Sequence, residues 1–234
     1  MQLMLPRLLS VNAGFIDAAA YLALKGLFAA HVTGNFVTLG AALVLGSSGA
    51  LAKLLALPVF CLVVLLARLA AHGLRARSLP VMSTLLVVQL ALMILGAALA
   101  TMFGPFASAD GQVALVTGMV LVAAMAIQNA AHRAHLASAP PSTIMTGTTT
   151  QIMMDLGDVM HGLAPEKARA TRERLTRMTV SVLAFAVGCT LGALLYAWLS
   201  VLCFWIPPAL VLGALCMRKA LADADRHDHL PAGA

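Results

Sequence analysis

The stretch HVTGNFVTLG, His31 to Gly40, contains the feature on which the prediction of the fold depends. It lies early in a strongly apolar chain, yet it carries a Thr-Gly step and an asparagine where a membrane-spanning helix would have leucine or valine. Much later, STIMTGTTTQ, Ser142 to Gln151, has the same Thr-Gly step in a similar polar setting. Because irregular backbone inside a bilayer is tolerated only where protein or a wet cavity surrounds it, this pattern predicts two interrupted helices.

Composition predicts an integral membrane protein whose expected partner is the lipid bilayer. The chain has 234 residues, of which 61% are hydrophobic and 10% are charged, whereas charged residues make up about a quarter of soluble chains. The net charge of +6 comes from basic residues in the short links between apolar runs, a pattern that the positive-inside rule explains without a nucleic acid. The four cysteines lie in or beside apolar runs and predict no disulfide, metal site or cofactor.

Six apolar runs are long enough, or nearly so, to cross a bilayer, which takes about 20 residues. They cover roughly 10–29, 54–74, 80–102, 112–132, 178–199 and 203–221. Two further segments, 31–47 and 142–162, have a polar opening and contain the Thr-Gly steps. The fold depends on whether these two segments cross the bilayer or return to the side from which they enter.

The positions of the basic residues favour the interpretation that both segments return to the side from which they enter. If both segments re-enter and the amino end is cytoplasmic, only Lys25 and Lys53 of the 15 basic residues lie outside. If both segments span, ten basic residues lie inside and five outside, and Arg68, Arg75 and Arg77 move to the outer face. The positive-inside rule therefore predicts an all-α protein with six transmembrane helices, two re-entrant helices and cytoplasmic termini.

The same order of elements in both parts of the chain predicts a 3+3 inverted repeat. The halves are 1–110 and 111–222, each with a span, a re-entrant segment and two spans, and a polar tail covers 223–234. Asp17 in AGFIDAAA aligns with Asn129 in AIQNAAHR when one gap is allowed, and the two Thr-Gly steps then face each other. Chance similarity between alanine-rich helices is the alternative.

Two interrupted helices that enter from opposite faces would bring positive helix ends and polar groups together near the midplane, where many transporters bind cargo. Gln128 and Asn129 precede the second step, but adjacent residues on a helix point in different directions, so at most one of them lines a pore. The candidate binding residues are Thr33, Gly34, Asn35, Gln128, Asn129, Thr146, Gly147 and Thr148. The structural alternative is two ordinary helix starts, or small residues that allow close helix packing.

Two acidic residues are candidates for carrying a coupling proton or ion. Asp17 lies about two turns into the first span, where a carboxylate must be paired, protonated or in contact with water. Asp155 follows the second Thr-Gly step and is also expected at depth. For Asp17 the alternative is a hydrogen bond to a polar neighbour such as Gln128 or Asn129.

The motifs AGFIDAAAYLAL and HVTGN in the first half, with IQNAAHRAHL and PPSTIMTGTTTQIMMDLGD in the second, resemble the YoaK family of bacterial membrane proteins. Nearly the whole chain shares the resemblance. Ala126, Ala134 and Ser142 depart from it, because a glycine, a basic residue and a threonine are expected there. The resemblance implies a bacterial inner-membrane location and no established activity.

The leading functional prediction is a secondary transporter for a small molecule or ion, coupled to protons through Asp17 or Asp155. The alternatives are a non-transporting assembly or sensor protein, whose small-residue faces would pack against partners, and a passive pore. No sequence motif of an enzyme appears. The substrate, the direction of transport, the coupling ion and the oligomeric state, including a homo-oligomer, stay open.

Overall fold

The computed structural model describes residues 4–136, 139–140, 142–143 and 145–228. The described residues form only helices and the links between them. The elements are α1 (Met4–Ala23), α2 (Gly34–Leu45), α3 (Ala50–Ala76), α4 (Val81–Phe103), α5 (Gln112–His135), α6 (Met145–His161), α7 (Pro165–Leu199), the 3₁₀ helix η1 (Ser200–Trp205) and α8 (Ile206–Asp228). The all-α prediction is therefore confirmed for this part of the chain.

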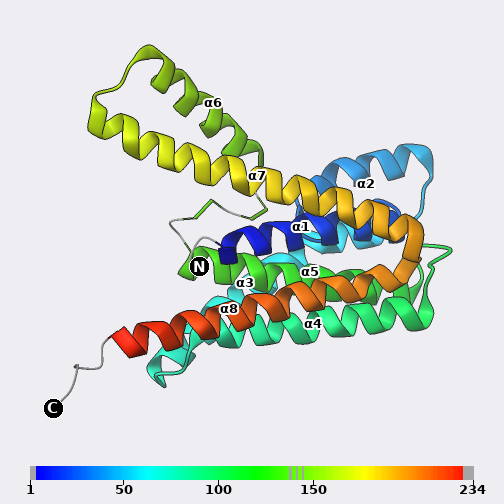
Figure 1. Cartoon of the computed structure of the whole chain (residues 1–234). Coiled ribbons are helices and arrows are strands. Elements are labelled where there is room, and N and C mark those ends of the chain that lie inside the picture. Colours follow the sequence, from blue (N-terminus) through cyan, green and yellow to red (C-terminus); the bar gives the residue numbers. More distant parts are fainter. Residues whose placement is uncertain (1–3, 137–138, 141, 144, 229–234) are drawn as a thin grey trace.

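Four helical stretches of the described residues are long and apolar enough to cross a membrane, by length and composition. These are α3, α4, α5 and one stretch from Pro165 to Ala220 that joins α7, η1 and α8. The last stretch reverses direction at η1, and α7 and α8 run in opposite directions (Figure 1). The chain thus has the apolar helices expected of a membrane protein.

Two helix boundaries differ from those predicted. The first apolar run was expected to be helical to about residue 29, but α1 ends at Ala23 because Lys25 and Gly26 adopt positive φ angles of 51° and 94°. The fifth run was expected to begin near residue 178, but α7 begins at Pro165. Proline suits the first turn of a helix, and the charged residues that follow are good helix formers, although they are too polar for a hydropathy count.

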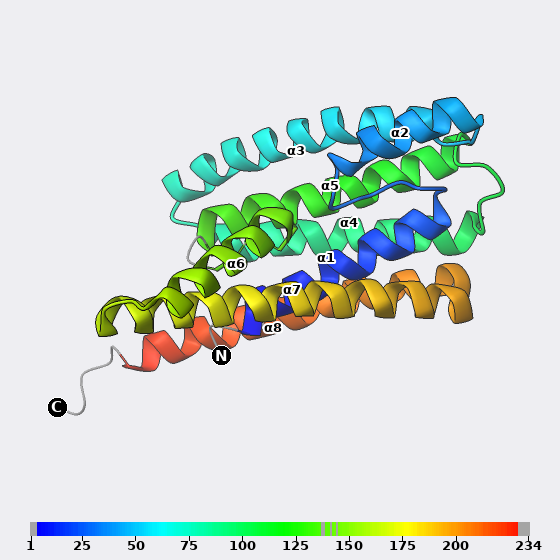
Figure 2. The same cartoon turned by 90° about the horizontal axis from the view of Figure 1, so that it is seen from above.

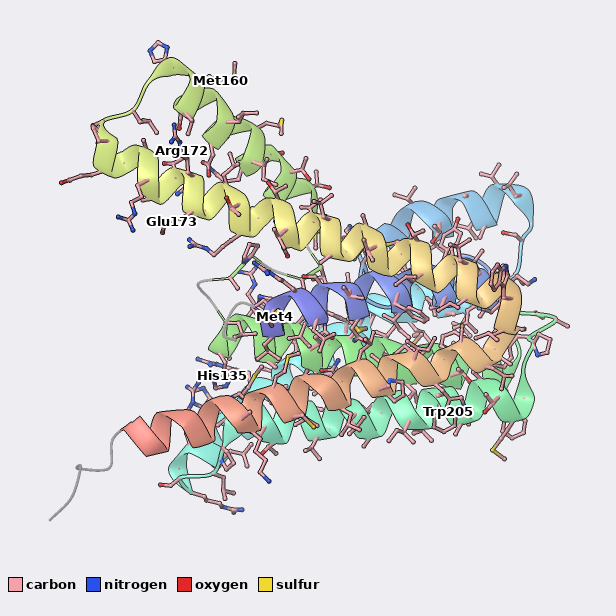
Figure 3. The ribbon with its side chains drawn as sticks, in the orientation of Figure 1. Met4, His135, Met160, Arg172, Glu173 and Trp205 are labelled. Carbon is pink, nitrogen blue, oxygen red and sulfur yellow. The ribbon has the colours of Figure 1, made fainter. Side chains whose placement is uncertain are left out.

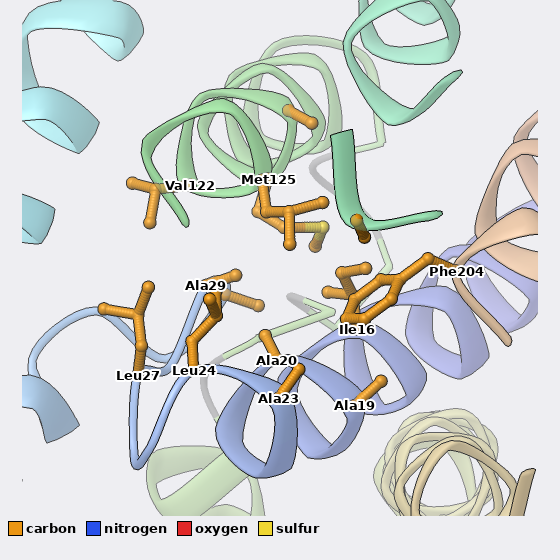
Figure 4. Packing of buried hydrophobic residues seen from close by; sticks show 14 of the residues in the cluster. Ile16, Ala19, Ala20, Ala23, Leu24, Leu27, Ala29, Val122, Met125 and Phe204 are labelled. Carbon is orange, nitrogen blue, oxygen red and sulfur yellow. The ribbon is translucent and has the colours of Figure 1, made fainter. Parts of the chain in front are cut away.

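Helix α1 lies inside the bundle. It packs against α7 and α8 and contacts α5, whereas α5 packs against α3 and α4. The hydrophobic core includes Ile16 of α1, Val122 and Met125 of α5, and Phe204 of η1 (Figure 4). Several alanines of α1 face this core, so the helix fits between larger neighbours without wide gaps.

Glycines bring α1 and α7 into backbone contact. Gly188 and Gly192 are one turn apart on α7, and a Cβ atom on either one would overlap the carbonyl oxygen of Val11 or Phe15 on α1. Gly14 on α1 has the reciprocal position, since a Cβ atom there would overlap the carbonyl oxygen of Phe185. Small residues four apart are a known device for close helix approach in membranes.

The segment between α1 and α3 turns back on itself. After α1 the chain returns toward the middle of the bundle, and α2 then runs outward to the end at which α1 stops (Figure 2). The ammonium of Lys53 joins the two ends of this excursion, because it donates hydrogen bonds to the carbonyl oxygens of Lys25 (2.8 Å) and Ser48 (3.1 Å). Helix α2 packs against α3.

Helix α6 has a corresponding course in the second half. It begins beside the middle of α7 and runs outward to the start of α7, so that α6 and the first part of α7 form a hairpin that projects from the bundle (Figure 1). Met160, Arg172 and Glu173 lie on this hairpin, far from Trp205 at the opposite end of the bundle (Figure 3). The polar openings of α2 and α6 therefore both lie at intermediate depth along the bundle.

Candidate functional site

A cavity of about 500 Å³ lies between the segment that leads into α2 and the stretch that leads into and begins α6. Thr33 and Thr146, one from each Thr-Gly step, both line it. The remaining lining comes from the same two segments and from α3 and α5: Ala30, His31, Val32, Phe60, Val64, Asn129, Ala130, Arg133, Thr143 and Met145. Two stretches that are far apart in the sequence thus contribute to one cavity.

Asn35 holds the first segment, which joins α1 to α2, in shape. Its side-chain Oδ1 accepts a hydrogen bond from the backbone N–H of Phe28 (2.9 Å), and its Nδ2 donates to the carbonyl oxygen of the same residue (2.8 Å). Gly34 lies under the Phe28 ring, because a Cβ atom there would be 3.1 Å from Cδ2 of that ring. Asn35 and Gly34 therefore shape the approach to α2 and do not line the cavity.

The first turn of α2 offers little free backbone. The N–H groups of Gly34, Asn35 and Phe36 donate to the carbonyl oxygens three residues earlier, at 2.8, 3.2 and 3.2 Å. Thr33, at the start of the helix, makes no capping hydrogen bond with its hydroxyl. This helix end therefore offers no row of free amides, and Thr33 is the residue of the Thr-Gly step that lines the cavity.

Asp17 fixes the same segment from the other side. Its Oδ1 atom accepts hydrogen bonds from the backbone N–H groups of Ala30 (2.6 Å) and His31 (3.3 Å). A hydrogen bond to Gln128 or Asn129 was the expected alternative, but the partners in the structure are backbone amides. Asp17 is only 3% exposed, and a buried carboxylate needs hydrogen bonds of this kind because burial removes its contact with water.

Asn129 has the corresponding role in the second half. Its Oδ1 accepts a hydrogen bond from the hydroxyl of Thr143 (2.8 Å), and its Nδ2 donates to the carbonyl oxygen of Met125 (3.2 Å). Thr143 stands three residues before Thr146, just as Ala30 stands three residues before Thr33. A side chain of α1 and a side chain of α5 thus each hold the segment that leads to a Thr-Gly step.

Gln128 faces away from the cavity, into a buried polar network. Its Oε1 accepts hydrogen bonds from Asn12 Nδ2 and Gln89 Nε2, both at 2.8 Å, and its Nε2 donates to the Leu9 carbonyl oxygen (2.9 Å) and the Ser142 hydroxyl (3.3 Å). Asn12, Gln89 and Gln128 are fully buried. Of the adjacent pair on α5, only Asn129 lines the cavity.

A second cavity, of about 460 Å³, lies on the far side of the first segment. Asp17 lines it together with Tyr21 and Phe28, and Phe185 and Cys189 of α7 also line it. His31 lines both cavities. The segment around His31 thus lies between a cavity that Asp17 lines and a cavity that Thr33 and Thr146 line.

Asp155 lies apart from both cavities. Its carboxylate receives two hydrogen bonds from the Arg174 guanidinium (2.6 and 2.8 Å) and one from Gln151 Nε2 (2.7 Å). This ion pair joins α6 to α7 in the projecting hairpin. Gly147 and Thr148 belong to the first turns of α6, where Thr148 is buried and Gly147 is exposed.

Sequence reasoning missed three polar residues of these sites. Arg133 lines the cavity, and the available signal was its spacing of four residues from Asn129, which places both on one helix face. Asn12 and Gln89 are single polar residues inside apolar runs, which was the signal for them. Among the described residues no cluster of three potential metal-ligating side chains occurs.

Comparison with known proteins gives a family and no activity. Searches of curated proteins and of solved structures found no match. A family model described as "Protein of unknown function (DUF1275)" matches residues 5–217, which is most of the chain, and the protein belongs to this family.

Proposed function

We propose that this protein is a small secondary transporter of the bacterial inner membrane, for a small molecule or ion and without enzymatic activity. The observation that carries the proposal is the cavity to which Thr33 and Thr146 both contribute. Transporters with broken helices bind cargo at such a meeting point, because polar side chains and interrupted backbone are available there inside an apolar bundle. The YoaK resemblance is compatible with this location.

The proposed architecture is six transmembrane helices and two re-entrant helices in a 3+3 inverted repeat. The packing pairs support it, because exchanging α1, α2, α3 and α4 for α5, α6, α7 and α8 converts one set of contacts into another. The pair α1–α7 becomes α5–α3, α1–α8 becomes α5–α4, and α2–α3 becomes α6–α7. The hydrogen bonds that Asp17 accepts from Ala30 and that Asn129 accepts from Thr143 follow the same exchange.

The bridge from Lys53 to Lys25 and Ser48 supports re-entry of the first segment from one side. With cytoplasmic termini, this end of the bundle is periplasmic and the basic link between α3 and α4 is cytoplasmic. The halves 1–110 and 111–222 then form one membrane domain of opposed repeats.

We assign proton coupling to Asp17. Protonation would weaken its hydrogen bonds to Ala30 and His31, because a neutral carboxyl group is a weaker acceptor than a carboxylate. Since Ala30 and His31 also line the cavity, a proton on Asp17 would loosen the cavity wall. Asp155 is the second candidate, but its bidentate pair with Arg174 favours a role in holding α6 against α7.

Cysteine accessibility tests the proposal. In a variant without the native cysteines, Thr33→Cys and Thr146→Cys are exposed to a membrane-impermeant maleimide in right-side-out and in inside-out vesicles. A transporter exposes its binding cavity alternately, so each cysteine should react from both sides. Reaction from one side alone, or from neither, would favour a non-transporting assembly or sensor protein, with which the close α1–α7 packing is also compatible.

The substitution Asp17→Asn separates a carrier from a passive pore. In a carrier this change should shift the balance between the states in which the cavity is open to one side or to the other. Labelling of Thr146→Cys should then become several-fold slower from one side and not from the other. In a pore the rates from the two sides should change together or stay as they were. Loss of folded protein alone would assign Asp17 to packing.

A further inference from the structure

The cavity that Thr33 and Thr146 line is called the Thr-Gly cavity below. Among the described residues that line it, Arg133 is the one member of the Arg, Lys, Asp and Glu group. It lies in the last turn of α5 and makes no ion pair with any residue that the structure describes. By contrast, Arg174 is paired with Asp155 and Arg169 with Glu173. Arg133 is exposed, so its guanidinium is hydrated and is open to an anion that enters the cavity.

The acidic residues Asp17 and Asp155 make their hydrogen bonds outside this cavity and do not line it. Asp17 lies behind the first segment and is held by the amides of Ala30 and His31, so its carboxylate does not line this cavity. Asp155 is engaged by Arg174. The Thr-Gly cavity therefore has a net positive lining, which attracts anions and disfavours cations.

The rest of the lining is of two kinds. Thr33 and Thr146 supply hydroxyl groups from the two sides. Phe60, Val64 and Met145 supply an apolar wall. A small number of polar groups in a mostly apolar cavity is typical of sites for small organic molecules, in which the polar groups orient the ligand.

We propose that the cavity binds a small organic carboxylate with an apolar body, whose negative charge pairs with the Arg133 guanidinium. Planar guanidinium groups match carboxylates with two parallel hydrogen bonds. The Thr33 and Thr146 hydroxyls donate to the same carboxylate or to a polar substituent, and the apolar body lies against Phe60 and Val64. This assignment rests on the proposed transport function and names the class of its cargo.

A matched set of probes tests the charge requirement. Benzoate, benzamide and benzylamine share a ring and differ in charge, and their binding to the purified protein in a neutral detergent is measured by calorimetry. Benzoate should bind at least tenfold more tightly than benzamide, and benzylamine should not bind. Equal binding of all three, preference for benzylamine, or no binding of benzoate would overturn the assignment.

Variants test the role of Arg133. Arg133→Gln should weaken benzoate binding at least tenfold, and Arg133→Lys should restore part of it because the charge is kept. The control is Arg77→Gln, since Arg77 is an exposed basic residue at the end of α3 and does not line the cavity. If Arg77→Gln weakens binding as much as Arg133→Gln, the effect is one of general surface charge and the proposal fails.

Two further measurements separate the possible failures. Phosphatidylglycerol is added in place of benzoate, because a lipid headgroup is the other source of negative charge for an arginine near a helix end. Binding of the lipid without binding of benzoate would make Arg133 a lipid anchor. Two-sided labelling of Thr146→Cys is then repeated. If it persists while benzoate fails to bind, the cargo class is wrong and the transport proposal stands, whereas loss of both contradicts both.

Discussion

Gln128 connects three helices through its side-chain amide. It accepts from Asn12 on α1 and Gln89 on α4, and it donates to the α1 backbone at Leu9 and to Ser142 before α6. Each of these hydrogen bonds lies where water is excluded, so the loss of one partner leaves the others unsatisfied. The network also ties Ser142, which precedes α6, to α5.

We predict that Gln128→Met destabilises the protein by about 2 kcal/mol, because two buried donors lose their acceptor while the volume of the side chain changes little. The free energy of unfolding in mixed detergent micelles measures this effect. The matched control is Gln112→Met, at the exposed start of the same helix, which should change the free energy by less than about 0.5 kcal/mol. Equal effects of the two changes would show that the hydrogen bonds of Gln128 do not stabilise the protein measurably.

Residue roles were less predictable than residue positions. Asp17 and the Thr-Gly steps stand out in the sequence because each is polar in an apolar setting, and the structure places Asp17 beside one cavity and Thr33 and Thr146 beside another. Asn35 is equally conspicuous, but its side chain is used to hold Phe28. That use depends on a turn whose shape cannot be inferred from composition or spacing.

At the scale of elements, the α1–α7 contact is governed by glycine. Gly188 lies against the α1 backbone at Val11, whereas Gly73 near the end of α3 has no neighbouring atom within 4 Å of an added Cβ. The same substitution at these two positions therefore isolates the effect of close helix packing.

We predict that Gly188→Ala destabilises the protein by about 2 kcal/mol, because the new methyl group overlaps backbone that can only yield by moving a helix. Gly73→Ala should be neutral or stabilise by up to about 1 kcal/mol, since alanine favours the helix. Thermal unfolding of both variants in the same detergent measures the difference. A tolerated Gly188→Ala would show that α1 and α7 are further apart than described.

Element positions followed from hydropathy where the helices are apolar, as in α3, α4 and α5. The predicted boundaries were wrong at the end of α1 and at the start of α7, where polar residues adjoin an apolar run. The turn at Lys25 and Gly26 ends α1 early, and the charged residues after Pro165 extend α7 beyond its apolar part. Hydropathy measures transfer into lipid and not helix formation, so it does not detect either boundary.

At the scale of the whole molecule, the course of the first segment decides which way the later helices point. Lys53 joins Lys25 to Ser48, and Gly49 N–H donates to Asp110 Oδ1 (2.9 Å), so the links before α3 and before α5 meet at one end of the bundle. If α2 crossed the bilayer instead, Lys25 would lie on the side opposite Ser48.

We predict that Lys25→Cys and Ser47→Cys, each in a variant without the native cysteines, react with an impermeant maleimide from the periplasmic side, and that Ser78→Cys reacts from the cytoplasmic side. Ser47 and Ser78 flank α3, whose 27 residues give a length of about 40 Å and are enough to cross the hydrocarbon core. All three positions are exposed, so absence of reaction from one side reports the membrane and not burial. Labelling of Lys25→Cys and Ser47→Cys from opposite sides would mean that α2 spans the bilayer, and the inverted repeat with its shared cavity would then have to be abandoned.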